Sequence, residues 1–256
     1  MSEREPELHE RNPTGRFSDR AADYVKYRPD YPPAAFEAML AGLGEPAVLR
    51  AADVGAGTGI SARALAGRIA SVLAVEPNAA MRAAAEQHPR VRWVSGTAEA
   101  TGLAGASVEL VLCAQAFHWF RPAEALAEFR RVLRPAGRLA LMWNIRNDAD
   151  ELTHGYGDVL RAAGDAGVPE VLDFDPAVIT PGGAFAPARV VKVPHTQLLT
   201  RVGLAGRALS ASYVPREGPG RDAIVARLEA LHDRHRDAAG LVTLRYETWL
   251  YLADVA

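Results

Sequence analysis

A glycine-rich segment and an acidic residue about twenty positions after it carry the clearest chemical signal in the sequence. The segment, Asp53–Gly59, reads DVGAGTG and follows a short apolar run. Glycine lets the backbone turn tightly and approach a ligand within van der Waals contact, because no Cβ stands in the way. Glu76 ends the next apolar run, where a carboxylate can accept hydrogen bonds from both hydroxyls of a ribose. Together they predict a binding site for a nucleotide-like ligand.

The residue after the glycines discriminates between ligand classes. A dinucleotide-binding fingerprint needs glycine or alanine three residues after Gly57, and Ile60 occupies that position. This difference disfavours a nicotinamide-dependent oxidoreductase, which stays open as an alternative.

A histidine between aromatic residues follows a long apolar run, in the segment Gln115–Phe120 (QAFHWF). An unperturbed imidazole titrates near pH 6.5. His118 is therefore suited to exchange a proton with a bound ligand. The alternative is a histidine that only fixes the turn, and packing is the simpler role for Trp119.

These residues lie at the ends of apolar runs that alternate with amphipathic segments, which is typical of a parallel sheet covered by helices on both faces. Strands are expected at 49–54, 71–76, 91–95, 108–114 and 138–143. Helices are expected between them at 61–70, 78–87 and 122–133. Ligands bind outside the carboxyl ends of such strands, where the glycine segment, Glu76 and His118 all lie.

The two ends of the chain have other patterns. Aromatic residues at helical spacing predict a helix over 17–28, and a second helix is expected at 33–43. After residue 145 we expect helices at 148–163, 200–212 and 221–236, and strands at 189–193 and 241–252. Residues 164–187, rich in Gly, Pro and Asp, are expected to form an irregular surface segment.

The sequence therefore predicts an α/β fold with a doubly wound, mostly parallel sheet of seven strands, an N-terminal helical cap and C-terminal lid elements. Residues 1–16 lack periodicity and are expected to be disordered. Residues 17–256 are expected to form a single domain, with a ligand-binding core at about 46–145 and a substrate-facing lid at about 146–220.

The composition of the chain limits the kinds of partner that it is expected to bind. Lys and Arg number 29 and Asp and Glu 31, so the net charge of −2 gives no field to concentrate nucleic acid, and a small molecule is the expected partner. The apolar runs are too short for a membrane span, and the charged start lacks the apolar core of a secretory signal, which indicates a cytoplasmic protein.

Cys113 is the single cysteine, and His232 and His235 lack an evident third ligand, so no metal is expected. Monomer and homodimer both stay open.

Residues 52–59 and Glu76 resemble the first motif and the ribose-binding acid of class I S-adenosylmethionine-dependent methyltransferases, over about residues 17–252 in all. The resemblance implies their Rossmann-like fold, S-adenosyl-L-methionine as cofactor, and Asp53 as the group that orients its amino group. A carboxylate suits this cofactor, which carries an ammonium and a sulfonium but no phosphate. The other cofactor contacts that the resemblance implies are Gly55, Ala56, Gly57, Pro77, Met81, Thr97, Ala98, Glu99 and Gln115. Thr97 stands where many members carry an aspartate that accepts from adenine.

The segment around His118, together with residues 17–32 and 141–144, is similar to the small-molecule branch that includes trans-aconitate methyltransferase. This similarity implies methyl transfer to oxygen, nitrogen or a carboxylate of a small organic acceptor. The residues expected to contact the acceptor or cap the cofactor are Tyr24, Arg28, Trp119, Trp143 and Asn144.

Methyl transfer is an in-line displacement that depends chiefly on aligning donor and acceptor. A hydroxyl or ammonium acceptor needs a base to remove its proton, and His118 is the candidate. A carboxylate acceptor needs no base. A non-enzymatic protein that binds S-adenosylmethionine is the remaining alternative.

Overall fold

The computed structural model describes residues 25–162, 174–211 and 213–256. Tyr24, the predicted disordered terminus and residues 163–173 of the predicted lid lie outside these ranges. The described residues form a seven-stranded sheet with the order β3-β2-β1-β4-β5-β7-β6. β1 to β5 pair in parallel, and β7 is antiparallel to both β5 and β6. The doubly wound, mostly parallel seven-stranded fold is therefore confirmed.

The first five strands follow the predicted apolar runs, but β5 begins at Leu133 rather than at residue 138 and ends at Arg146 rather than at residue 143. They are β1 (Arg50–Val54), β2 (Ser71–Val75), β3 (Val91–Val94), β4 (Val108–Ala114) and β5 (Leu133–Arg146). The helices of this part are α2 (Pro33–Leu40), α3 (Ile60–Ala66), α4 (Ala79–Ala84) and α5 (Pro122–Val132), with short 3-10 turns η2 (Pro46–Val48) and η3 (Phe117–Trp119). Asn78 caps the N-terminus of α4, and its side chain accepts from the N–H groups of Ala80 and Met81.

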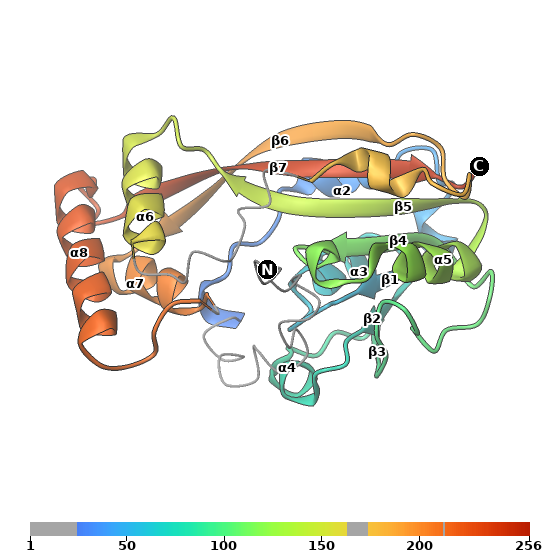
Figure 1. Ribbon diagram of the computed structural model, residues 1–256, viewed down its shortest axis with the longest axis horizontal. Helices are drawn as coiled ribbons and strands as arrows, with labels where there is room; N and C mark the ends of the chain where they lie inside the picture. The colour runs from blue at the N-terminus through green and yellow to red at the C-terminus, as the bar shows by residue number, and fades with distance from the viewer. Residues whose placement is uncertain (1–24, 163–173, 212) are drawn as a thin grey trace, which may run out of the picture.

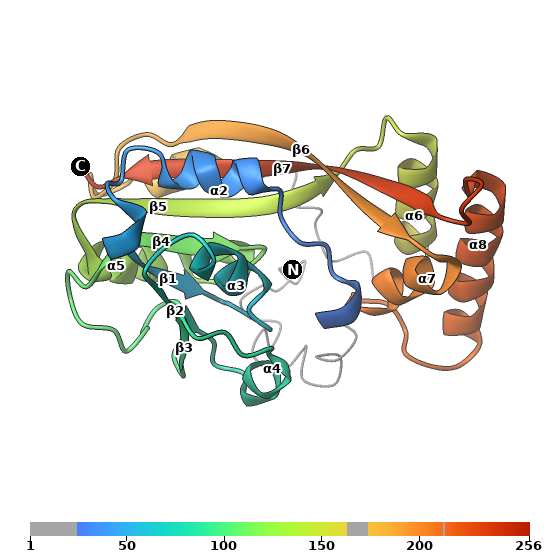
Figure 2. The ribbon, with the colours of Figure 1, turned by 180° about the vertical axis from the view of Figure 1, so that it is seen from behind.

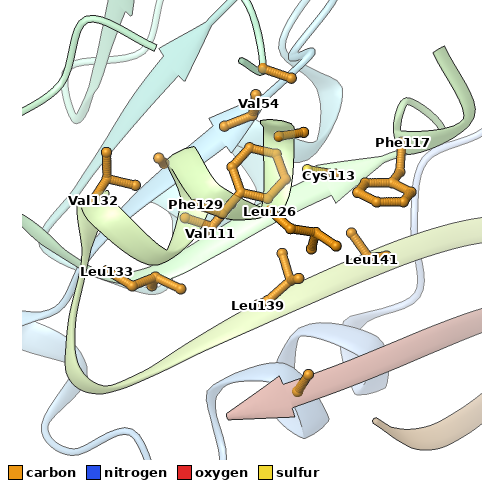
Figure 3. Packing of buried hydrophobic residues seen from close by; sticks show 14 of the residues in the cluster. Val54, Val111, Cys113, Phe117, Leu126, Phe129, Val132, Leu133, Leu139 and Leu141 are labelled. Carbon is orange, nitrogen blue, oxygen red and sulfur yellow. The ribbon is translucent and has the colours of Figure 1, made fainter. Parts of the chain in front are cut away.

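Helices cover both faces of the sheet (Figures 1 and 2). On one face, Phe129 and Leu126 of α5 pack onto Val111 and Leu139 (Figure 3). The opposite face is covered by α2 and α3, which lie in front of the sheet in Figure 2. β4 is almost entirely apolar because it is buried on both faces, apart from Glu109 near its start.

The last three strands reach beyond this core. After α6 (Glu151–Arg161) and the 3-10 turn η5 (Pro176–Ile179), the chain forms β6 (Arg189–Leu199), α7 (Arg201–Leu209), α8 (Pro219–His235) and β7 (Val242–Asp254). β5, β6 and β7 run as continuous strands from the core toward α6, α7 and α8 (Figure 1). These three helices are called the cap below and are distinct from the N-terminal helical cap that the sequence predicts. They pack around Tyr156, Leu204 and Leu228. The start of β7 contributes Val242 to the same cluster, so the cap has its own apolar core.

Two parts of this region differ from the expectation. β6 continues past the predicted end at residue 193, through Pro194, to Leu199. A proline lacks the N–H of a ladder bond but is tolerated in β6 because this strand lies at the edge of the sheet. Residues 174–187 are irregular, as expected, but they bury Ile179 and Phe185 against the sheet, so this segment is partly core rather than surface.

The described residues contain no helix long and apolar enough to cross a membrane. Among them there is also no group of three or more His, Cys, Asp or Glu side chains that could hold a metal ion. Cys113 is buried in the sheet, and its burial raises the pKa of the thiol.

Candidate functional site

The strand order reverses between β1 and β4, and ligands bind at such a switch point, outside the carboxyl ends of the strands. The glycine loop lies there, between β1 and α3. Gly55, Gly57 and Gly59 have φ angles of 70°, 56° and 79°, in the left-handed region that glycine favours. A Cβ on Gly55 would lie 2.7 Å from Cβ of Ala116 and 2.9 Å from Cζ of Phe120. Glycine is therefore required here by packing against the chain after β4 as well as by backbone conformation.

Glu76, directly after β2, contacts the glycine loop. Its Oε2 accepts from the N–H of Gly57 at 2.9 Å, and its Oε1 accepts from the N–H of Asn78 at 2.8 Å. Burial raises the pKa of this carboxyl, and the two backbone hydrogen bonds oppose the rise. Each carboxylate oxygen has a further lone pair. Glu76 can thus hold the loop and accept from ligand hydroxyls at the same time.

Asp53, near the end of β1, is fully buried. Its Oδ2 accepts from the hydroxyl of Ser61 at 2.6 Å, while its Oδ1 has no hydrogen-bond partner among the described residues. Burial raises the pKa of this carboxyl to about 7, the hydroxyl of Ser61 and the nearby backbone N–H of Ala62 oppose the rise, and the charge of Glu76 adds to it. A buried polar atom without a partner costs free energy, and an ammonium group would supply both the missing donor and the opposite charge. The site therefore fits a ligand with an amino group.

Five further residues expected to contact the cofactor divide into two kinds. Met81 of α4 and Ala98 are buried apolar side chains, and Pro77 is half-buried. Thr97 and Glu99 instead have local partners: Thr97 Oγ1 accepts from a backbone N–H at 3.2 Å, and Glu99 Oε1 accepts from the N–H that opens α5 at 3.0 Å. The expected cofactor contacts of these five residues stay predictions.

Gln115 directly follows β4 and has an unusual backbone conformation. Its φ of 57° is in the left-handed region, which is uncommon for a residue with a side chain. Its N–H donates to the carbonyl of Met142 at 2.8 Å, and its Nε2 donates to the carbonyl of Asn144 at 3.4 Å. These bonds to β5 hold the strained residue where the chain leaves the sheet.

His118 lies in the 3-10 turn after β4 and is held by a residue of β5. The indole Nε1–H of Trp143 donates to Nδ1 of His118 at 3.3 Å. Because an indole N–H can only donate, Nδ1 carries the lone pair and Nε2 carries the proton of the neutral ring. Burial lowers the pKa of His118 to about 4, so the ring is neutral at pH 7. The ring of Trp119 lies against it, with centroids 5.0 Å apart.

Residues 27–31, called the strap below, connect the cap with the core. On the cap side, the carbonyl of Tyr27 accepts from Gln197 Nε2 at 2.9 Å, and Arg28 Nη2 donates to the carbonyl of Ser210 at 3.3 Å. Tyr27 also packs directly on α7, since a Cβ on Gly206 would lie 2.5 Å from its ring.

On the core side, Asn144 of β5 fixes the other half of the strap. Its Nδ2 donates to the carbonyl of Asp30 at 2.9 Å, and its Oδ1 accepts from the hydroxyl of Thr248 at 2.6 Å. The structure thus gives Asn144 a positioning contact that the sequence did not reveal.

A pocket lies between the glycine loop, the strap and α7. It is lined by Arg28, Pro29, Tyr31, Gly55, Ala56, Ile60, Ser61, Ala114, Gln115, Asn144 and Arg207. The structure therefore brings together Gly55, Ala56, Gln115, Arg28 and Asn144 from the predicted set. The remaining predicted site residues among those described do not line it.

Arg207 is the pocket residue that sequence reasoning missed. It belongs to α7 and is 7% exposed. In the sequence Gly203–Ala208, Arg207 is a basic residue among small and apolar ones, and this contrast could have marked it. An arginine is normally expected to be exposed to solvent, and only the fold shows that this one is buried.

Fold and loop together define a methyltransferase-like cofactor domain, and comparison with known proteins agrees. A methyltransferase domain family matches residues 52–141. An uncharacterized methyltransferase of Mycobacterium tuberculosis is 36% identical over 201 residues, which cover 77% of this chain and 76% of the relative. An uncharacterized methyltransferase-like protein of Schizosaccharomyces pombe is 34% identical over 189 residues, 72% of each chain.

A solved structure from Anaeromyxobacter dehalogenans, described as a candidate type II methyltransferase, has 27% identity and a TM-score of 0.62. The match covers 90% of this chain and 97% of that one. The chain therefore belongs to the class I S-adenosylmethionine-dependent methyltransferases.

Proposed function

We propose that the chain transfers a methyl group from S-adenosylmethionine to a small organic acceptor bound in the pocket between the glycine loop, the strap and α7. The observation that carries this proposal is Asp53 Oδ1, a buried carboxylate oxygen without a partner among the described residues. An ammonium group bound there would satisfy it, whereas the phosphates of a nicotinamide dinucleotide would be repelled.

Two of the cofactor-binding residues, Asp53 and Glu76, have surroundings that support their proposed roles. S-adenosylmethionine, when bound, supplies an electrophilic methyl group on a sulfonium. Asp53 would hold its ammonium, and Glu76 would accept from the ribose hydroxyls while keeping its bonds to the backbone. The glycine loop lets the backbone approach the ligand. The residues proposed to enclose the remaining cofactor surface are Gly55, Ala56, Gly57, Pro77, Met81, Thr97, Ala98, Glu99 and Gln115.

The acceptor would lie among Arg28, Gln115 and Asn144, which line the pocket. Asn144 holds the strap and thereby sets the width of the pocket. Alignment and exclusion of water by these walls supply the proximity on which methyl transfer depends.

His118 does not line the pocket but follows the pocket residue Gln115 by three positions, and the group that it can offer is Nε2–H, a hydrogen-bond donor rather than a base. Its Nδ1 lone pair is engaged by Trp143, and its pKa of about 4 makes the ring a weak proton acceptor. This arrangement favours an acceptor that gives up no proton to the protein, such as a carboxylate.

Calorimetric titration with S-adenosylhomocysteine and with NAD⁺ tests the cofactor. We expect the first ligand alone to bind, and Glu76→Gln to weaken it about tenfold or more, because hydrogen bonds to a charged group contribute about 1.5–3 kcal/mol. Glu86→Gln is the matched control, since this acid is an exposed partner of Arg63. Binding of NAD⁺ but not of S-adenosylhomocysteine would contradict the proposal.

The acceptor is identified by incubating the protein with isotope-labelled S-adenosylmethionine and a metabolite extract. Mass spectrometry of the labelled product identifies both the molecule and the methylated atom. A protein that binds the cofactor but labels no compound in any extract would be a binding module, as in the non-enzymatic alternative.

A further inference from the structure

Arg207 is a buried cation on the cap side of the pocket. Its side chain projects from α7 into a pocket that also includes Gly55 and Ser61 of the core. Its Nε has no hydrogen-bond partner in the part of the chain that the structure describes. Besides burial, the groups with the largest influence on its charge are the hydroxyls of Tyr156, Tyr213 and Tyr246.

A chain of hydrogen bonds leads from the neighbourhood of Arg207 to the strap. The hydroxyl of Tyr246, which lies near Arg207, donates to Gln197 Oε1 at 3.3 Å. Gln197 Nε2 in turn donates to the carbonyl of Tyr27 in the strap at 2.9 Å. Nε of Arg207 and the neighbouring buried hydroxyl of Tyr156 both lack a partner within the described residues.

A buried cation without an opposite charge is unfavourable. Moving a charge out of water costs several kcal/mol, and tyrosine hydroxyls offset that cost only in part. A bound anion would supply the missing charge and accept from the unused donors. Arg28 lines the same pocket, so two arginines border the space that the acceptor would occupy.

We infer that the methyl acceptor is an organic acid whose carboxylate pairs with Arg207. This inference rests on the proposed methyl transfer and names the substrate class for it. The planar guanidinium matches a carboxylate through two parallel hydrogen bonds, which also fixes the orientation of the acceptor.

The carboxylate of the cofactor is the competing occupant. The groups proposed for the cofactor, Asp53 and Glu76, belong to β1 and the end of β2 in the core, whereas Arg207 belongs to the cap. An acceptor placed between them would contact the cap. Measuring cofactor and carboxylate binding separately distinguishes the two occupants.

The test uses Arg207→Gln, with Arg201→Gln as the matched control. Arg201 is on the same helix but exposed, where it pairs with Glu229 and Asp233. Succinate, citrate and the neutral compound glycerol are titrated in thermal-shift and calorimetric experiments, with and without S-adenosylhomocysteine. We expect saturable binding of at least one acid to the unmodified protein and to Arg201→Gln, and at least tenfold weaker binding to Arg207→Gln. The affinity for S-adenosylhomocysteine should stay within twofold.

Arg207→Lys covers the case in which the glutamine variant does not fold. Lysine keeps the positive charge but lacks the planar guanidinium with its paired N–H donors, so this variant should bind the acid more weakly than the unmodified protein. A variant that loses S-adenosylhomocysteine, or a protein that binds neither acid in either condition, would overturn the inference. If the unmodified protein binds an acid but not S-adenosylhomocysteine, the proposed function is contradicted. The acid titrations without S-adenosylhomocysteine still test the role of Arg207 in that case.

Discussion

Trp143 on β5 donates its indole N–H to Nδ1 of His118, which follows β4, and this contact at 3.3 Å sets the tautomer of the histidine. A residue that the sequence suggested as a base is thereby presented to its surroundings through Nε2–H. Trp143 is buried, with 1% of its surface exposed, and His118 is half-buried. The consequence is a pH dependence that differs from that of an exposed histidine.

His118→Ala is expected to lower methyl transfer about tenfold to a hundredfold, the loss of one buried hydrogen bond, without changing the affinity for S-adenosylhomocysteine. Because the pKa of His118 is about 4, the rate of the unmodified protein should show no ionisation of this residue between pH 5.5 and 8. Rate profiles of both proteins over this range check the expectation. An ionisation near pH 6.5 that disappears in His118→Ala would instead identify a base.

Asp53 is expected to couple cofactor binding to pH. Its pKa of about 7 means that the carboxyl is largely protonated at pH 6, whereas the ammonium of the ligand prefers the carboxylate. The affinity for S-adenosylhomocysteine should therefore rise up to about tenfold per pH unit below pH 7 and level off above it. Calorimetry between pH 5.5 and 8 measures this slope. Asp53→Asn should bind weakly with little dependence on pH, and a steep slope in that variant would exclude Asp53 as the coupled group.

The same carboxyl affects the stability of the ligand-free protein. Its pKa is raised in the fold above the ordinary value of 3.8, so the folded state binds more protons, and stability falls as pH rises from about 4 through 7. Because asparagine does not ionise, Asp53→Asn should lack this decrease in the free energy of unfolding. The decrease amounts to up to about 4 kcal/mol, at about 1.4 kcal/mol per pKa unit. The difference in Tm between variant and unmodified protein should therefore increase with pH, and a constant difference would contradict the buried ionisation.

Gly206→Ala probes the contact between the strap and the cap. An alanine normally stabilises a helix by about 1 kcal/mol relative to glycine. Here its Cβ would lie 2.5 Å from the ring of Tyr27, so we expect a loss of about 1–3 kcal/mol instead. Chemical denaturation measures the change.

Gly157→Ala is the control for this substitution, since the nearest atoms to its Cβ belong to the flexible end of Arg161. It should be neutral or stabilising. Removing the ring in a Tyr27→Ala, Gly206→Ala double variant should cost less than the sum of the single changes. Additive effects would show that the two residues do not meet.

The cofactor side of the site could be predicted because its signals are local. Glycines in a strand-to-helix turn have few alternative readings, and Glu76 lies at the matching end of the next strand, so their contact follows from the parallel pairing of β1 and β2. The partner of His118 could not be predicted, because Trp143 comes from a different strand and only the register of β4 with β5 brings it near. Arg207 was out of reach for a similar reason, since its surroundings are tyrosines scattered over α6, β7 and the chain after α7.

The extent of β6 escaped prediction because a proline normally argues against a strand. The position of β6 at the sheet edge removes that objection, but the edge is known only when the strand order is known. The residues of β6 that the prediction left out, from Pro194 to Leu199, are the ones that lead toward the cap.

β5, β6 and β7 pass without interruption from the cofactor core to the cap, so the two walls of the pocket share one set of strands (Figure 1). Side chains alternate between faces along a strand, and inserting or deleting one residue would turn every later side chain to the opposite face. The spacing between the two walls is therefore fixed by strand register. A change of acceptor specificity would have to come from point substitutions in α7 and the strap, because altering the length of these strands would also disrupt the cap.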